Sequence, residues 1–198
     1  MTIWPEAMQE VGAAERERLH AKLEEAAGRA GLLDVAYRTL DTPIGRLLLA
    51  ATEQGLVRVA FAHEDSDRVL EELSRAISPR VLRAPGRLDE AAREIEEYFA
   101  RRRREFEVPV DLRLSKGFRR QVLARLPTIS YGKTASYGAL AAAVGHPGAA
   151  RAVGTACATN PVPIVVPCHR VVRSDGSPGQ YGGGTETKVA LLEMEAAG

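Results

Sequence analysis

The sequence of 198 residues has few cysteines, no long apolar run and almost no net charge. Cys157 and Cys168 are too few for a disulfide framework, and their spacing relative to His146 and His169 matches no common zinc pattern. No stretch approaches the length of a membrane-spanning helix, and the N-terminal residues lack the basic end and apolar core of a secretory signal. We therefore expect a cytoplasmic protein that binds no membrane, holds no metal and needs no cofactor.

Charge is divided unevenly along the chain. Residues 115–198 hold 9 Lys and Arg against 4 Asp and Glu, whereas residues 1–114 hold 18 against 22. A positive field over one half favours a polyanionic partner, although a solvated surface has the same composition. With 45% hydrophobic residues, the chain can build a core for one large or two small domains.

The first half of the chain predicts a small α+β domain at residues 34–114. Three short strand-like runs, residues 35–40, 45–51 and 56–61, are separated by turn residues and predict a β-meander. Residues 67–77 and 88–100 then carry apolar side chains at helical intervals, the second as Leu88, Ala92, Ile95 and Phe99. A short extended link with Pro109 follows, and we place the domain boundary near Leu114.

Two charged segments of this half have simple interpretations. Residues 5–31 mix alanine with charged residues, and Met8, Val11, Leu19 and Leu23 recur loosely at helical spacing, so we predict a helical arm over residues 1–33. Four arginines at residues 101–104 follow the second helix. The glutamates around them favour a solvated helix C-terminus over a phosphate contact.

Helical patterns dominate residues 115–198. Residues 118–126 have an apolar side and an arginine side, and Pro127 stops them. Residues 134–145 predict a short helix capped by Thr134 or Ser136, and residues 149–159 predict another after a tight turn. Two short helices joined in this way are typical of a helix-turn-helix. The predicted fold class is thus α+β, a β-meander domain followed by a mostly helical domain.

The second helix of this pair has small residues on its N-terminal part and a single long side chain, Arg151. Such a face suits close packing against another helix. It equally suits a shallow groove of nucleic acid, in which Arg151 would fill the space left by an extruded base. The small residues are Ala149, Ala150, Ala152 and Gly154.

The apolar run at residues 162–166 is the sequence around which this domain is organised. Its β-branched residues predict a buried strand, and Pro167 must end that strand because proline cannot donate to a ladder. Cys168 and His169 would then lie at the lip of a rigid element. A buried thiol can be inert, and the pair alone leaves the inert and the reactive interpretations open.

A reactive Cys168 needs a proton acceptor, because its ordinary pKa of about 8.5 leaves little thiolate at neutral pH. His169 is adjacent, but successive residues of an extended chain point to opposite faces, so a bridging water or a turn at Pro167 is required. A carboxylate should orient the imidazole, and Glu193 or Glu195 of the last helix is available. Arg170 is expected to fasten the loop.

The ordered set SYG, RAVG, NPVPIVVPCHRVV, YGGG and LLEME resembles the O6-alkylguanine-DNA alkyltransferase family over residues 116–195. The resemblance implies that Cys168 accepts the alkyl group and that His169, through water, takes the thiol proton. It also implies that Glu195 holds His169, that Asn160 braces the turn before the thiol, and that Tyr137 donates to the departing base. The base pocket implied by the resemblance consists of Tyr181, Gly182, Gly183 and Val171.

The same resemblance implies a DNA-repair protein that acts on double-stranded DNA. The helix-turn-helix would lie in the minor groove, and Arg151 with the small residues 149, 150, 152 and 154 would contact the duplex while the nucleotide is flipped out. Alkyl transfer from O6-alkylguanine, and from O4-alkylthymine, would be irreversible, with one turnover per molecule. We expect a monomer in solution. Gly182 and Thr185 depart from the serine and leucine common in the family, which affects the size of the pocket.

Two other classes of function fit parts of the sequence. A Cys-His hydrolase would need a separate histidine with its own orienting group, and His20, His63 and His146 all lie in polar or turn contexts. A helix-turn-helix regulator would bind a specific duplex and have no need of the thiol. Transfer of an alkyl group to Cys168 distinguishes the alkyltransferase from both.

Overall fold

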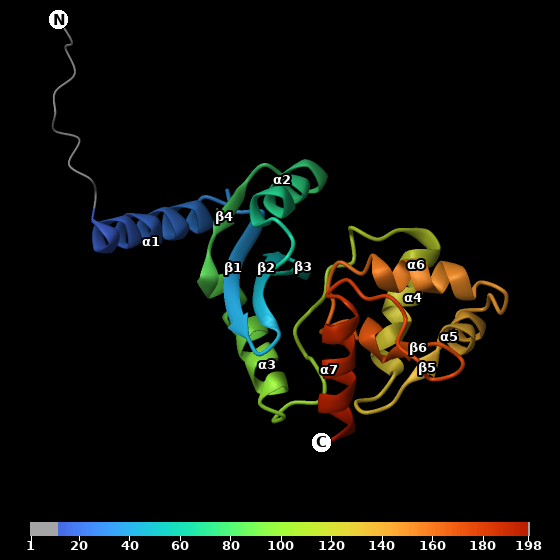
Figure 1. Cartoon of the computed structure of the whole chain (residues 1–198). Helices are drawn as coiled ribbons and strands as arrows, with labels where there is room; N and C mark the ends of the chain where they lie inside the picture. The colour runs from blue at the N-terminus through green and yellow to red at the C-terminus, as the bar shows by residue number, and fades with distance from the viewer. Residues whose placement is uncertain (1–11, 198) are drawn as a thin grey trace, which may run out of the picture.

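The computed structural model describes residues 12–197 of the chain and confirms the predicted α+β architecture. In Figure 1 a sheet with its helices lies on one side and a group of helices on the other. The last helix, α7 (Thr185–Ala196), lies between the two groups, although it is last in the sequence.

The sheet is built from the predicted meander and one additional strand. β1 (Val35–Thr42), β2 (Gly45–Thr52) and β3 (Gly55–Phe61) pair antiparallel, with Tyr37 opposite Ala50 and Leu49 opposite Val59. The additional strand, β4 (Val81–Arg83), pairs parallel to β1 and makes the order β3-β2-β1-β4. At three residues it is too short to show a period-2 pattern in the sequence.

Alternation along β2 assigns its side chains to two layers of core. Leu47 and Leu49 face the main hydrophobic cluster, which contains α3 (Asp89–Phe99), whereas Leu48 and Ala50 face a smaller cluster with α2 (Ser66–Ala76). On α3, Ala92 and Ile95 are buried, as is Leu88 just before the helix, and Phe99 packs against the same cluster, so the predicted face is confirmed. Tyr98, which was not predicted, is also fully buried.

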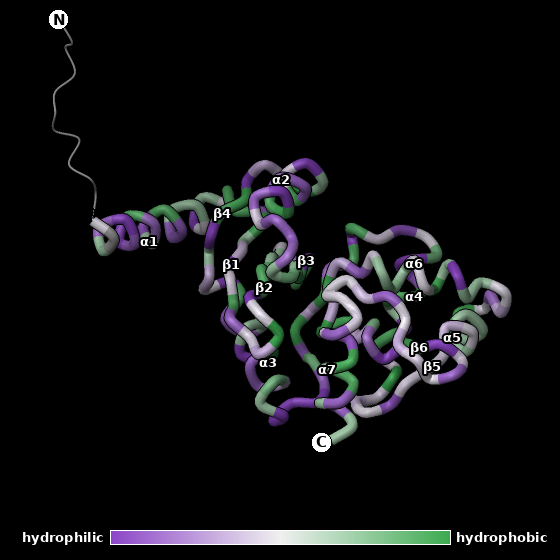
Figure 2. Tube along the Cα trace, in the orientation of Figure 1, coloured by the Kyte–Doolittle hydropathy of each residue, from purple (hydrophilic) through white to green (hydrophobic). Residues whose placement is uncertain are grey.

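The predicted arm is the helix α1 (Ala13–Arg29), while residues 1–11 lie outside the described residues. Leu19 and Leu23, whose helical spacing supported this prediction, are 48% and 53% exposed. The helix contacts the rest of the protein through His20, which is hydrogen bonded to the Arg83 carbonyl, and through Glu17, which pairs with Arg83. Ala27 adds an apolar contact with the main cluster. Figure 2 shows many hydrophilic residues along α1.

The second half contains α4 (Gly117–Arg125), the predicted pair α5 (Tyr137–Ala143) and α6 (Ala150–Ala158), and α7. Of the two proposed caps for α5, Ser136 is the correct one, because its Oγ accepts the Ala139 N–H at 3.0 Å. Gly145 follows α5 at φ 81°, a left-handed conformation that glycine adopts without strain. The two helices pack against each other as a helix-turn-helix.

The predicted strand at residues 162–166 is not formed. The segment is buried as expected, but it is a turn in which Val166 N donates to Val162 O at 2.9 Å and Ile164 has φ 76°. Prolines at 161, 163 and 167 leave Val165 as the one donor that a strand would have on that edge, so the β-branched residues pack in a compact loop. Cys168–Arg170 then forms one turn of 3-10 helix, η3, followed by β6 (Val171–Val172), which pairs with β5 (Ala135–Ser136).

The two halves share one continuous hydrophobic cluster. Val59 N on β3 donates to Pro161 O at 2.8 Å, which attaches the buried turn to the sheet. The link predicted to be extended runs beside the start of β3, where Leu56 N donates to Pro109 O and Asp111 N to Leu56 O. The domain boundary near Leu114 stays a prediction, since the core crosses it.

Candidate active site

Asn160 holds the buried turn and the thiol together. Its side-chain amide donates to Val166 O at 2.8 Å and to Cys168 Sγ at 3.1 Å, while its Oδ1 accepts from Val162 N at 3.0 Å. These bonds satisfy buried backbone groups that a strand would have paired. One side chain thus stabilises the turn and orients the sulfur.

The Cys168 thiol is buried, and its surroundings oppose its ionisation. The residue is 1% exposed, and burial raises its pKa to about 11, against the Asn160 hydrogen bond and the nearby Lys188, which both lower it. Cys168 nevertheless lines a cavity of about 420 Å³ between the sheet and the turn, together with Phe61 and Gly182. Cys168 therefore borders a cavity, and its thiol requires a proton acceptor to become the reactive thiolate.

Glu195 is the most highly coordinated carboxylate among the described residues of the site. Its Oε1 accepts from His169 Nε2 at 2.9 Å, and both oxygens accept from the Arg170 guanidinium. Gly132 N donates to Oε2 at 3.1 Å. Burial works to raise the pKa of Glu195, but the hydrogen bonds from His169 and Arg170 prevail and lower it to about 2. The group is ionised at neutral pH, and of the two candidate glutamates it is Glu195 that faces inward.

His169 is fully buried, and its tautomer follows from its partner. An ionised Glu195 can only accept, so the proton lies on Nε2 and Nδ1 remains an acceptor. His169 Nδ1 is buried without a hydrogen-bond partner among residues 12–197. Burial also lowers the pKa of His169, although Glu195 acts to raise it. The imidazole is therefore neutral near pH 7. The side chain is thus a neutral base with one unused acceptor atom.

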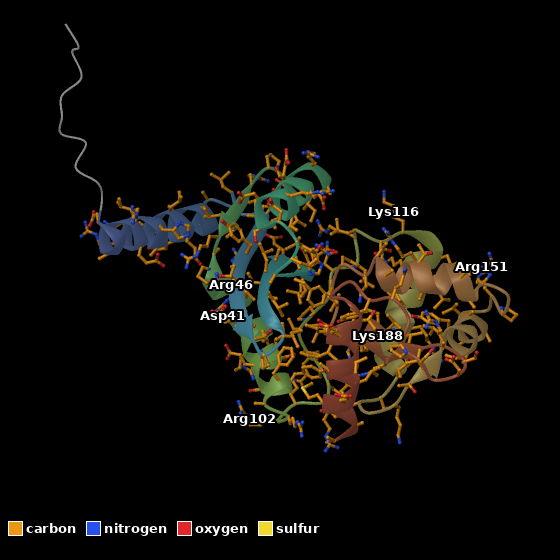
Figure 3. The ribbon with its side chains drawn as sticks, in the orientation of Figure 1. Asp41, Arg46, Arg102, Lys116, Arg151 and Lys188 are labelled. Atoms are coloured by element: carbon orange, nitrogen blue, oxygen red, sulfur yellow. The ribbon has the colours of Figure 1, made fainter. Side chains whose placement is uncertain are left out.

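A second buried network contains Lys188 and Tyr137. Lys188 Nζ donates to the Val171 carbonyl and to the Tyr137 hydroxyl, the latter at 3.4 Å. Burial lowers the pKa of Lys188, whereas it raises the pKa of Tyr137. Lys188 is fully buried in the middle of the molecule, as Figure 3 shows. A phenol beside an ammonium group can give up a proton and have the charge stabilised.

The face of α6 that was predicted to meet DNA is open. Arg151 is exposed and lies at the outer edge of the molecule in Figure 3, away from the sheet. A cavity of about 540 Å³ extends over this face, lined by Tyr137, Ala150, Arg151 and Gly154. Ala149 precedes the helix as its N-cap, and Ala152 is exposed.

The loop before α7 forms the wall around the thiol. Tyr181 is 8% exposed, and its ring packs edge-on against His169 and Phe61, at centroid distances of 6.3 and 5.6 Å. A Cβ on Gly183 would lie 2.7 Å from the Phe61 ring, so this position requires glycine. Gly182 lines the cavity of Cys168, and Ala158 lines both this cavity and the one over α6. Val171 is fully buried beneath them.

Family models match almost the whole described chain. Residues 117–197 match the model described as 6-O-methylguanine DNA methyltransferase, DNA binding domain. Residues 35–112 match the model described as 6-O-methylguanine DNA methyltransferase, ribonuclease-like domain.

Curated relatives agree over most of their own length. The methylated-DNA–protein-cysteine methyltransferase of Mycobacterium tuberculosis H37Rv is 42% identical over 161 residues, which are 81% of this chain and 92% of the relative. The chain belongs to the methylated-DNA–protein-cysteine methyltransferase family. The constitutive Bacillus subtilis methyltransferase of the same name is 37% identical over 162 residues, 80% of this chain and 94% of the relative. Like its relatives, the chain is a DNA-repair methyltransferase that transfers an alkyl group to cysteine.

Solved structures place this methyltransferase in the same fold. The crystal structure titled Mycobacterium tuberculosis OGT in complex with DNA superposes with a TM-score of 0.72 at 41% identity, covering 82% of this chain and 93% of that one. The crystal structure of the Mycobacterium tuberculosis O6-methylguanine methyltransferase gives a TM-score of 0.71 at 41% identity. DNA binding by the second half of this methyltransferase follows from the matched DNA-binding domain.

Sequence reasoning assigned no role to Lys188, and it missed Tyr98. Lys188, Leu191 and Glu195 are all buried on one face of α7, at a helical spacing that the sequence already contains. Tyr98 donates to Glu195 from the other half of the methyltransferase, at a separation of 97 residues, so no local pattern could have found it.

Three further features of the chain concern its run of arginines, metal binding and membrane-spanning helices. In the run of arginines, Arg103 pairs with Glu97 at 2.9 Å and with Glu94 at 3.5 Å, as expected of a helix end rather than a phosphate site. Within residues 12–197 no group of three or more His, Cys, Asp or Glu side chains is arranged to hold a metal ion. No helix in this part of the chain is long and apolar enough to cross a bilayer.

Proposed function

We propose that Cys168 accepts a methyl or other alkyl group directly from O6-alkylguanine, and from O4-alkylthymine, in double-stranded DNA. The observation that carries the proposal is the arrangement of groups around Cys168 Sγ. Asn160 orients it, a cavity reaches it, and the residue that follows it is a neutral, buried histidine held by an ionised glutamate. This is the arrangement of nucleophile, base and orienting group that activates a thiol.

The proton of Cys168 would leave through His169. Since Nε2 is bound to Glu195, the atom that can accept the proton is Nδ1, which is buried and without a protein partner in the described chain. A water molecule between Sγ and Nδ1 would carry the proton, and the resulting imidazolium would be stabilised by the Glu195 carboxylate. Burial that raises the pKa of Cys168 to about 11 keeps the thiol unreactive until substrate arrives.

Transfer would then be a single displacement at the alkyl carbon. The Cys168 thiolate forms a new C–S bond as the C–O6 bond breaks, and the electron pair of that bond goes to the guanine. Tyr137 would donate its proton to the departing base, with Lys188 beside it to stabilise the phenolate. A thioether does not hydrolyse under these conditions. Each molecule would therefore act once.

The lesion would reach the sulfur by leaving the duplex. A base within the stack cannot present O6 in line with a thiolate, so the nucleotide must be flipped out, and a lesion that pairs weakly costs less to flip. The exposed α6 face, with small residues and Arg151, supports an approach from the minor groove in which Arg151 occupies the vacated space. Tyr181, Gly182, Gly183 and Val171 would surround the flipped base.

Mass spectrometry of the intact protein tests the proposal. After incubation with a duplex containing one O6-methylguanine, we expect a single methyl group on the peptide that contains Cys168, at a one-to-one ratio with repaired DNA. Cys168→Ser should bind the duplex equally well and gain no methyl group. More than one repaired lesion per molecule, or an unmodified Cys168 after repair, would exclude this mechanism. A thymine duplex with O4-methyl tests the second substrate.

Two accompanying properties can be checked in the same reaction. We propose that the chain acts as a monomer and without a metal, so transfer should be unchanged in the presence of a strong chelator. Sedimentation of the free protein should give the mass of one chain, 21.4 kDa.

A further inference from the structure

Tyr98 brings the hydroxyl of one half of the molecule into the active site of the other. Tyr98 lies on α3, which packs beneath the sheet, and its side chain is completely buried in the core. Its hydroxyl donates to Glu195 Oε1 at 2.7 Å and lies 3.5 Å from His169 Nε2. Among the hydrogen bonds of the described site, this is the one that a side chain of the sheet half donates to the catalytic network.

The hydroxyl of Tyr98 is not needed to fill space. The ring packs among Phe99, Phe106 and Tyr131, at centroid distances of 5.4, 5.3 and 6.1 Å, where a phenylalanine would serve equally well. Burial, followed by the charge of Glu195, raises the pKa of Tyr98, so the phenol keeps its proton and acts as a donor. The effect of the hydroxyl therefore falls on the Glu195 carboxylate rather than on the packing of the ring.

We propose that Tyr98 is a positioning residue that sets the basicity of His169 through Glu195, so that the sheet half completes the proton relay of the thiol. The inference rests on the roles proposed above for Cys168, His169 and Glu195. Tyr98 and His169 donate to the same oxygen, Oε1, which the guanidinium of Arg170 also reaches. By donating to Oε1, Tyr98 partly neutralises the carboxylate. The carboxylate then stabilises the protonated form of His169 less.

The sign of the effect follows from the groups that face His169. Glu195 favours its protonated form, whereas Arg170 on its own turn and Lys188 on α7 disfavour it. The remaining titratable neighbours, the phenols of Tyr98 and Tyr181 and the Cys168 thiol, are neutral because burial raises their pKa. Removing the Tyr98 hydroxyl leaves the carboxylate less neutralised. The pKa of His169 should then rise, and less of the neutral base should be present on the acid side of the rate profile.

The experiment compares Tyr98→Phe with the full-length wild type and with Tyr37→Phe. The control, Tyr37→Phe, also removes a tyrosine hydroxyl, but from β1. There Tyr37 packs against the smaller cluster on the other face of the sheet. The second-order rate constant of methyl transfer from an O6-methylguanine duplex is measured from pH 5.5 to 9. Duplex affinity is measured in parallel. We expect the acid limb of Tyr98→Phe to move to higher pH by roughly half a unit, which is about a threefold loss of rate at the lowest pH, since a hydrogen bond to a charged group contributes more than this.

The outcomes separate this inference from the proposed function. A wild type that fails to methylate Cys168 overturns the proposed function itself. If the wild type methylates Cys168 and Tyr98→Phe reacts at the same rate, the proposed role of Tyr98 is overturned while the proposed function stands. The same holds if Tyr98→Phe is slowed by an equal factor at every pH. As a second variant, 3-fluorotyrosine incorporated at position 98 keeps the hydroxyl and makes it a stronger donor, so its acid limb should move to lower pH. A limb that stays in place for this variant also overturns the inference, whether or not Tyr98→Phe folds.

Discussion

Replacing Glu195 by glutamine should strongly destabilise the protein, because the carboxylate holds several buried donors at once. Oε1 and Oε2 together accept from His169, Arg170, Tyr98 and the Gly132 N–H. A glutamine amide is neutral and places an NH2 group where one oxygen accepted. At least one donor would then face another donor, and the Arg170 guanidinium would remain buried without a counter-charge.

Two routes lead to a similar magnitude for this loss. Removing one partner of a buried ion pair costs about 3–5 kcal/mol. Separately, the hydrogen bonds of the folded state lower the pKa of Glu195 from 4.5 to about 2, which at ~1.36 kcal/mol per unit corresponds to about 3 kcal/mol. For a chain of this length, about 3–5 kcal/mol lowers the Tm by roughly 6–20 °C.

Urea unfolding at two pH values is the assay. A lowered pKa stabilises the folded state above the unfolded value of 4.5, and this contribution disappears as pH falls toward 2. At pH 7 we expect Glu195→Gln to be less stable than wild type by about 3 kcal/mol or more. At pH 3 the wild type should have lost about 2 kcal/mol of this contribution, so the difference between the two proteins should shrink.

The matched control is Glu193→Gln on the same helix. Glu193 is exposed, so the same change should shift stability by less than about 0.5 kcal/mol at either pH. Equal stability of Glu195→Gln and wild type at pH 7, or a difference that does not shrink at pH 3, would refute the reasoning.

Two further substitutions test the other parts of the site. Arg151→Ala should slow repair of duplex DNA roughly tenfold or more while leaving the slow reaction with free O6-methylguanine base unchanged, because Arg151 is proposed to act on the duplex; equal slowing of both reactions would contradict this role. Asn160→Ala removes the hydrogen bonds to Cys168, Val162 and Val166 and should cost about 2–4 kcal/mol in urea unfolding, and a loss below about 1 kcal/mol would show that the turn stabilises itself.

Local patterns predicted most of the secondary structure, and their failures have physical causes. The meander and its turns were visible because alternation and turn residues are local properties. β4 was missed because three residues carry no period, and its pairing with β1 depends on a partner far away in the sequence. The run at residues 162–166 was taken for a strand on its β-branched composition. Its prolines and the side chain of Asn160 make it a turn instead.

The helix α1 was predicted correctly, but its contacts were not predictable. Helical spacing of Leu19 and Leu23 does not show which face a helix presents to the protein, and both side chains are exposed. The helix is attached through Glu17 and His20, both to Arg83, and through Ala27, which packs against the main core cluster. These contacts depend on residues far away in the sequence.

The sequence by itself determined the family of this protein. Its ordered motifs SYG, RAVG, NPVPIVVPCHRVV, YGGG and LLEME are local, so they can be recognised without a structure, and the resemblance makes Cys168 the proposed alkyl acceptor. Only the tertiary structure decided how Cys168 and His169 are protonated. Burial makes His169 neutral and Cys168 a thiol, and both shifts depend on distant residues that fold around them. Lys188 and Tyr98 enter the site through packing of α7 and α3, because long-range contacts, unlike local patterns, are set by how the elements assemble.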